Sequence, residues 1–339
     1  MKERLYLIAV AAVALLAVSC NKEEGCKVCE QGKPVEVTVQ IKGASLTKAT
    51  NVAADDEVRV ANLQIFAFNA VGELEGYRNA VDATSVTFTA SSGEKTIWAV
   101  VNAPSMEQIQ SLDALKASVT ELTANARDAF VMTGSVTDEL ADGDVITITV
   151  KRIVSRVSVG KVTARYPDTP AFAGKSLKLV GMYMLNVVGS LDFALEGQPQ
   201  SWLNKLAHSD AAADVFLYDA LDNDLANGSS YEVEHVFYPY PNSVDASVKQ
   251  LAADERGTWS PRRSILCLEV EFGGEVGYYP VELPVIDRNK RYVIDELVLT
   301  RKPGSVPYDP IETGDATVSI EVSDWDTTIK LGDNGILTI

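Results

Sequence analysis

The chain has 339 residues, of which 46% are hydrophobic, and its net charge is −17. This length allows two domains, and the acidic balance argues against a nucleic-acid partner, because phosphates attract a basic surface. With only two histidines and no HExxH, P-loop or GxSxG sequence, the chain gives no indication of catalysis. We therefore expect a protein that is not an enzyme and that holds no cofactor and no metal.

The first twenty residues are typical of an export signal. Lys2 and Arg4 precede an apolar stretch over residues 5–18, and a small residue stands just before Cys20. The stretch is short for a bilayer-spanning helix. Its end, AVSC, is similar to a bacterial lipobox, although Ala stands where Leu is commoner. We expect a signal peptide over residues 1–19 and lipid on Cys20; an ordinary secreted protein is the alternative.

The clearest strand follows a polar tether. The sequence VEVTVQIKG alternates apolar and polar residues with a period of two, which predicts a half-buried strand. The next stretch, SLTKATN, is small and polar, as expected of an exposed loop that a protease can reach. The apolar face of the strand consists of Val35, Val37, Val39 and Ile41.

The rest of the N-terminal half predicts more strands and one helix. Strand patterns occur in VRVANLQIFAFN, SVTFTA, KTIWAVVNAP and DVITITVKRIVSRVSVGKVTA. Between them, Ser105 and Gln108 match a capping box. A helix is therefore expected to begin near Ser105 and to pack on a sheet through four residues at helical spacing: Met106, Ile109, Leu112 and Leu115.

The second half continues the strand pattern. Candidates are SLKLVGMYMLNV, YEVEHVFYPY, RSILCLEVEF, VGYYPVELPV, RYVIDELVLTR and ATVSIEVSDW. A polar stretch over residues 202–227 is expected to form a helix and loops, and RYPDTPAFAGK is expected near a domain junction. Many short strands separated by turn signals indicate sandwiches, so we predict a mainly all-β chain with two tandem β-sandwich domains and minor helices.

An ordered set of motifs resembles the Bacteroidetes fimbrillins, the type V pilins. In the C-terminal half these motifs are HVFYPYPN, GYYPVELP and IDRNKRYVIDELVLTRKPGSVPYDP; in the N-terminal half they are NLQIFAFNAVGEL, WAVVNAP, MTGS and VKRIVSRVSV. The resemblance covers nearly the whole chain. It implies two transthyretin-like β-sandwich domains, over residues 49–163 and 164–325, with a tether and removable first strand over 20–48 and a donor segment over 326–339.

The resemblance also implies a function. Such a subunit reaches the outer membrane as a lipoprotein, loses its N-terminal segment to a surface protease, and polymerises into a fimbrium by donor-strand exchange, which supports adhesion and biofilm. Implied partners are other fimbrial subunits and a host or bacterial surface ligand. The family's usual Arg-Ala cleavage pair is Lys48-Ala49 here, which puts an arginine-specific protease in doubt. Arg59 is the next basic residue, but a cut there would damage a strand that the remaining domain needs.

The donor segment is predicted from its apolar residues: Ile329, Leu331, Ile336, Leu337 and Ile339. An ordinary last strand that folds back on its own domain is the alternative.

Other functions fit the same sequence. An anchor subunit would keep its first strand and its lipid, and Lys48 in place of Arg keeps this hypothesis open. A tip adhesin would be expected to have a distinct binding domain. A surface glycan-binding lipoprotein, also built of β-sandwiches, would need an exposed aromatic platform, for which Trp202 and Trp259 are the candidates in polar contexts.

Overall fold

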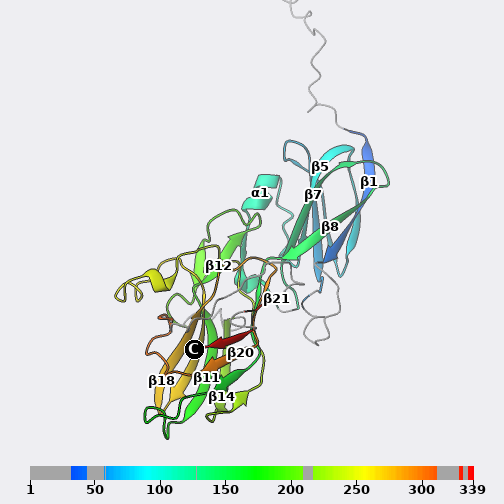
Figure 1. Ribbon diagram of the computed structural model, residues 1–339. Coiled ribbons are helices and arrows are strands. Elements are labelled where there is room, and N and C mark those ends of the chain that lie inside the picture. The colour runs from blue at the N-terminus through cyan, green and yellow to red at the C-terminus, as the bar shows by residue number, and fades with distance from the viewer. Residues whose placement is uncertain are drawn as a thin grey trace, which may run out of the picture.

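The computed structural model describes residues 32–43, 57, 59–126, 128–208, 217–310, 328–330 and 335–339. Strands dominate these ranges, as predicted, and they gather into two lobes. Figure 1 shows β1, β5, β7 and β8 in the N-terminal lobe and β11, β14, β18 and β20 in the C-terminal lobe. The predicted all-β fold is confirmed. No helix within the described ranges is long and apolar enough to cross a membrane.

The N-terminal lobe is a sandwich whose two layers share one continuous strand order, β3-β2-β5-β7-β8-β1-β4. β7 and β8 pair only at Met132 with Arg152 and Thr133 with Lys151, so the ribbon folds over at this corner. The strands are β1 (Pro34–Gly43), β2 (Asn62–Phe68), β3 (Leu74–Val81), β4 (Ser85–Ser91), β5 (Gly93–Val101), β7 (Met132–Leu140) and β8 (Val145–Arg152).

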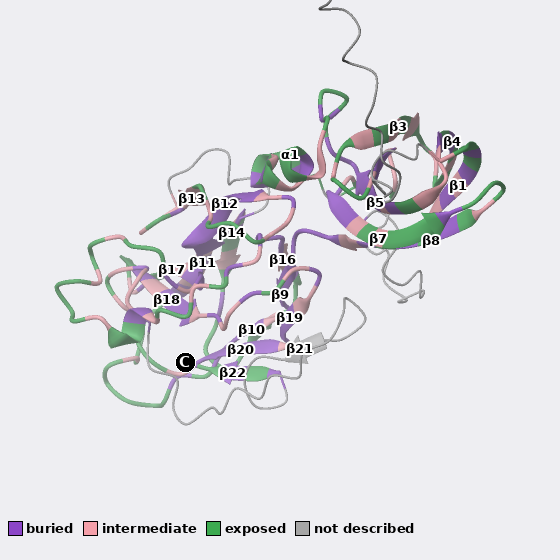
Figure 2. Cartoon of the chain, turned by 90° about the horizontal axis from the view of Figure 1, so that it is seen from above, coloured by how far each residue is buried: buried purple, intermediate pink, exposed green. Residues whose placement is uncertain are grey.

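One face of the C-terminal lobe is an antiparallel sheet in the order β14-β11-β17-β18. It contains β11 (Leu177–Leu185), β14 (Tyr218–Asp224), β17 (Ile265–Phe272) and β18 (Glu275–Glu282). The inward side chains of β11 and β17 belong to the largest apolar core, and buried residues run along β11, β12 and β20 in Figure 2.

The opposite face consists of two four-stranded sheets, ordered β15-β10-β20-β22 and β16-β9-β19-β21. Their strands are β9 (Arg156–Val159), β10 (Val162–Ala164), β15 (Ser230–Tyr231), β16 (His235–Phe237), β19 (Arg291–Ile294), β20 (Glu296–Leu299), β21 (Thr328–Lys330) and β22 (Ile336–Thr338).

The two lobes are joined by a small sheet and by a shared core. β6 (Val119–Glu121) pairs with β12 (Val187–Asp192), which also pairs with β13 (Ser201–Leu203). Phe66 and Phe130 from the N-terminal half lie in the same apolar cluster as Tyr238 and Tyr240 from the C-terminal half. Short helical segments complete the described chain: α1 (Leu112–Ala117), η2 (Leu122–Ala124) and η4 (Val248–Gln250).

The predicted helix begins later than its sequence suggests. α1 starts after Ser111, whose hydroxyl accepts a hydrogen bond from the Ala114 N–H. Ahead of it, the Gln64 side chain accepts from the Met106 N–H at 2.8 Å and donates to the carbonyl of Pro104. The predicted capping box at Ser105 is therefore wrong, because a buried side chain of β2 takes the backbone groups that a helix start would use.

The expected helix within residues 202–227 is described only in part. β13 and β14 lie in the described residues of this stretch and Leu217 is helical, while residues 209–216 are outside the description. β9 and the start of β10, which we placed before the domain boundary at residue 163, pair only with strands of the C-terminal half. Strand pairing thus changes lobe after Arg152, within the stretch DVITITVKRIVSRVSVGKVTA, all of which we placed in the N-terminal domain except its last residue. The candidate strand ATVSIEVSDW lies outside the described residues.

Gly134 gives a test of the corner between β7 and β8. A Cβ atom there would lie 2.3 Å from the Thr149 carbonyl oxygen and 3.0 Å from Cγ2 of Ile148. We expect Gly134→Ala to lower the free energy of unfolding by about 1–3 kcal/mol, because the backbone must shift. Urea unfolding measures this. In Gly257→Ala the nearest atom is 3.4 Å away, so the change should stay within about 0.5 kcal/mol; equal effects would refute the account.

Candidate functional site

β1, the strand predicted to be removable, lies between β8 and the edge strand β4 of its sheet. β1 pairs antiparallel with β4 along the whole of β4, and parallel with β8 from Thr38 opposite Val145 to Gly43 opposite Val150. No other strand among the described residues pairs with β4. β1 is therefore the only strand link, within the described ranges, between β4 and the rest of the sandwich.

The inward face of β1 fills the core of this lobe. Val37 and Val39 are fully buried, and Val35 and Ile41 are nearly so. They join one apolar cluster with residues of both layers, including Leu63, Ile65, Phe88, Ile97, Ile148 and Val150. The apolar face predicted from the period of two is thus a plug between the sheets.

The outward face and the backbone of β1 add polar links. The Thr38 hydroxyl lies 2.9 Å from the Thr87 hydroxyl, and the Gln40 amide donates to the Thr147 hydroxyl at 2.8 Å. Without β1, the backbone groups of β4 and β8 that face it would lose their partners and an apolar trough would open. Both consequences are costly in water.

The chain after β1 returns to the same place. Gly43 lies opposite Val150 of β8, and the next described residue, Glu57, accepts a hydrogen bond through its carbonyl from Nε of Arg152, at the end of β8. Lys48 and Ala49 lie between these two points, outside the described residues, and so does Cys20. Gly43 and Glu57, the described residues on either side of the predicted cleavage site, are therefore both attached to the end of β8.

Glu57 is a functional candidate that sequence reasoning missed. Its side chain is 5% exposed; Oε1 accepts a hydrogen bond from the Tyr238 hydroxyl at 2.6 Å and lies 3.5 Å from Nε of Arg156. Arg156 also pairs with Glu234 at 3.0 Å. In the sequence Glu57 ends an acidic run, ADDE, and nothing there distinguishes it from its neighbours, because its partners come from the other half of the chain.

The surroundings of Glu57 are rich in buried cations. Arg291 lies opposite Arg156 on the neighbouring strand, and burial together with the Arg156 charge lowers the pKa of Arg291. Burial also acts to lower the pKa of Arg156, but the carboxylates of Glu234 and Glu57 outweigh it and the net shift is upward. The Glu57 carboxylate therefore adds to Glu234 in stabilising the buried Arg156 guanidinium.

The predicted donor residues lie on their own domain in this single chain. β22 runs parallel to β20, with Leu337 and Ile339 buried and Ile336 exposed. β21, which contains Ile329, runs parallel to β19; its side chains and Leu331 are outside the description. The chain thus shows the folded-back arrangement of this segment.

The described surface does not offer a flat aromatic platform at the tryptophans that we singled out. The rings of Trp202 and Trp259 pack edge to face with centroids 6.0 Å apart, and Nζ of Lys205 lies 4.6 Å from the Trp259 ring centre. The two rings are half-buried against each other. They serve to hold the loop that carries Trp259 against β13.

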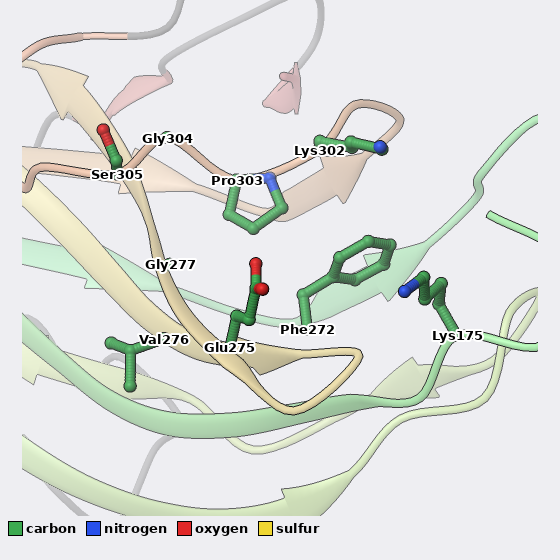
Figure 3. Close-up of a pocket in the computed structure, with 9 residues that line it drawn as sticks. All are labelled: Lys175, Phe272, Glu275, Val276, Gly277, Lys302, Pro303, Gly304 and Ser305. Atoms are coloured by element: carbon green, nitrogen blue, oxygen red, sulfur yellow. The ribbon is translucent and has the colours of Figure 1, made fainter. Parts of the chain in front are cut away.

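A hollow of about 190 Å³ lies between the β17–β18 hairpin and the segment after β20 (Figure 3). Its one aromatic residue, Phe272, is mostly buried and packs on Tyr166 and Phe172. The lining consists of Lys175, Phe272, Glu275, Val276, Gly277, Lys302, Pro303, Gly304 and Ser305. Within the described ranges, no group of three or more His, Cys, Asp or Glu side chains could hold a metal ion.

Comparison with known proteins shows the fold and a family match over the N-terminal half. Residues 34–164 match the profile of the family described as the major fimbrial subunit protein (FimA). A search of curated proteins finds no match to the chain. Among solved structures, a candidate cell adhesion protein from Bacteroides eggerthii is similar, with a TM-score of 0.63 and 14% identity over 87% of this chain and 97% of its own.

Two other solved structures agree. A candidate cell adhesion protein from Parabacteroides distasonis has a TM-score of 0.56 and 16% identity, over 84% of this chain and 99% of its own. A fimbrilin (FimA) from Porphyromonas gingivalis has a TM-score of 0.54 and 14% identity, over 82% of this chain and 93% of its own. The resemblance seen in the sequence is confirmed: residues 34–164 match the FimA major fimbrial subunit family, and the chain has the fimbrillin fold.

Proposed function

We propose that this protein is a structural subunit of a fimbrium at the cell surface and that it polymerises by donor-strand exchange. The observation that carries the proposal is the position of β1. This strand lies between β8 and β4, supplies an apolar plug to the core, and is joined to the rest of the lobe through a segment that contains Lys48. One cut in that segment would free β1 without interrupting any other strand that the structure describes.

Removal of β1 would create a binding site for another strand. The backbone groups of β4 and β8 would face an open groove, and pockets once filled by Val37 and Val39 would line it. A strand with apolar residues at alternate positions could replace β1, with main-chain hydrogen bonds providing affinity and side chains setting the register.

Residues 326–339 of a neighbouring subunit are the proposed donor. Leu337 and Ile339 alternate with Ile336 and Thr338, and they are buried by the strand's own domain in the single chain. β22 is an edge strand, so it can leave without interrupting other pairings. Exposing two such side chains costs roughly 1.5–3 kcal/mol each, which burial in a neighbour's groove would offset.

The lipid has a delivery role in this scheme. We propose that Cys20 is acylated and holds the subunit at the outer membrane while β1 fills the groove. Acyl chains contribute roughly 0.8 kcal/mol for each buried CH₂ group, so that several chains make a stable anchor. Cleavage after Lys48 would release the lipid together with β1. An uncut subunit would remain attached and would act as an anchor, which is the second candidate function.

Lys48 gives the first test of the proposal. We expect protein from the cell surface to begin at Ala49 and to run unboiled on a denaturing gel as a ladder, because strand-paired subunits separate only on unfolding. Lys48→Ala should give a lipidated monomer, whereas Lys48→Arg should still be cut. N-terminal sequencing and the gel measure both. A lipidated Cys20 without a ladder in the natural protein would contradict the stalk role and favour an anchor or a glycan-binding lipoprotein.

A substitution of Val37 should affect the stability of the precursor but not that of the assembled fibre. Val37→Asp places a carboxylate in a fully buried position and should lower the precursor's free energy of unfolding by about 4 kcal/mol. Subunits that do assemble should dissociate at the same temperature as the natural fibre, because β1 has left them. Lys42→Asp on the exposed side of β1 is the control and should change neither quantity much. A fibre weakened by Val37→Asp would show that β1 is retained.

Deletion of residues 326–339 tests the donor. The ladder should disappear, since no strand remains to fill the neighbour's groove. The deletion also removes Leu337 and Ile339 from their own core. Leu297→Ala is therefore the matched control, because Leu297 lies opposite Leu337 in that core but outside the donor: it should lower monomer stability by about 2–5 kcal/mol but still give a ladder. Polymers formed by the deletion variant would rule out this donor.

A further inference from the structure

We infer that the buried Glu57 site is a clamp that holds the chain just after the removable segment and thereby protects the peptide bond after Arg59 from proteolysis. The inference deepens the proposed processing at Lys48, on which its biological meaning rests.

In this clamp, Glu57 is bound through both its side chain and its backbone. The carboxylate accepts from the Tyr238 hydroxyl and faces Arg156, and the carbonyl accepts from Nε of Arg152. Tyr238 is itself fixed, because its ring packs on Phe130 with centroids 4.7 Å apart. These partners come from β8, β9 and the segment after β16, so that a short N-terminal stretch is bound by both lobes.

A second anchor follows immediately. The Asn102 side chain donates to the Arg59 carbonyl at 2.8 Å and accepts from the Ala61 N–H at 2.8 Å. The Asn102 side chain also donates to the Phe130 carbonyl at 3.0 Å, and Asn102 is 8% exposed. The bond after Arg59 thus lies between two buried attachment points, Glu57 and Asn102.

An exposed Arg59 side chain does not make the peptide bond after it easy to cleave. The Arg59 side chain is 54% exposed and pairs with Asp128, so by exposure alone a protease for basic residues could select it. A protease needs several residues of chain to be pulled out of the fold, and local opening governs that step. The clamp opposes the opening, because removing Glu57 from Arg156 leaves a buried guanidinium with poorer compensation.

The clamp also defines what the processed subunit keeps. After a cut behind Lys48, Glu57 would lie near the new N-terminus. Among the described residues it would be the first one bound to the C-terminal lobe. β2 begins at Asn62 and pairs with both β3 and β5. Holding Glu57 would keep β2 in register while β1 is replaced, whereas a cut after Arg59 would detach this anchor.

Limited digestion of the full chain with trypsin tests the inference. We expect fragments that begin at Val60 to form at least about tenfold faster in Glu57→Ala than in the natural protein. Glu75→Ala is the matched control: it removes a carboxylate on β3 that lies 3.4 Å from Nζ of the buried Lys95, a different buried cation. The control should leave cleavage after Arg59 unchanged. N-terminal sequencing of the fragments over time measures each rate.

Tyr238→Phe keeps the test decisive if Glu57→Ala does not fold. It retains the ring on Phe130 and removes only the hydroxyl that donates to Glu57, and it should raise cleavage after Arg59 by a few-fold. Unchanged rates in the folded variants, or an equal rise in Glu75→Ala, would overturn the clamp. Since trypsin is added from outside, this result is independent of whether the natural N-terminus is Ala49, which the surface protein's own sequence decides.

Discussion

The architecture of the N-terminal lobe depends on backbone pairing by its first strand. β1 provides the strand pairing of β4 and extends the layer that starts at β8, while its valines fill the space between the layers. Covalently, however, β1 precedes every other described strand and is joined to them by one segment. A strand that is paired on both sides and first in sequence can be lost by one cleavage, and the exposed groove then requires a substitute.

The junction between the lobes can hold the chain after β1 in place once β1 has been lost. If β1 leaves, the chain that follows needs another attachment. Glu57 is fixed by Tyr238, Arg156 and Arg152, and the apolar core continues from Phe130 into the C-terminal lobe. The junction draws its contacts from distant parts of the chain and does not use β1. Its buried charges need mutual compensation, which makes the geometry specific.

The C-terminal strands β21 and β22 can also leave their sheets without disrupting other strands. β21 and β22 each pair with one strand only, at the edges of their sheets. In the single chain they cover apolar surface that would otherwise face water. An edge position keeps such a strand removable, because its departure interrupts one ladder and leaves the sheet behind it intact. The same apolar residues that fold back on their own domain have the alternation needed to fill another subunit's groove.

The sequence by itself determined the all-β class, the alternating face of β1 and most strands, because a period of two is a local property that does not depend on partners. Its motif order also indicated the fimbrillin family. The tertiary structure decided the start of α1, where Gln64 of β2 takes the backbone groups near Met106. It also decided that β9 and β10 join the C-terminal lobe and that Glu57 is buried among arginines. Those features depend on contacts between residues far apart in the chain, and no local pattern encodes them.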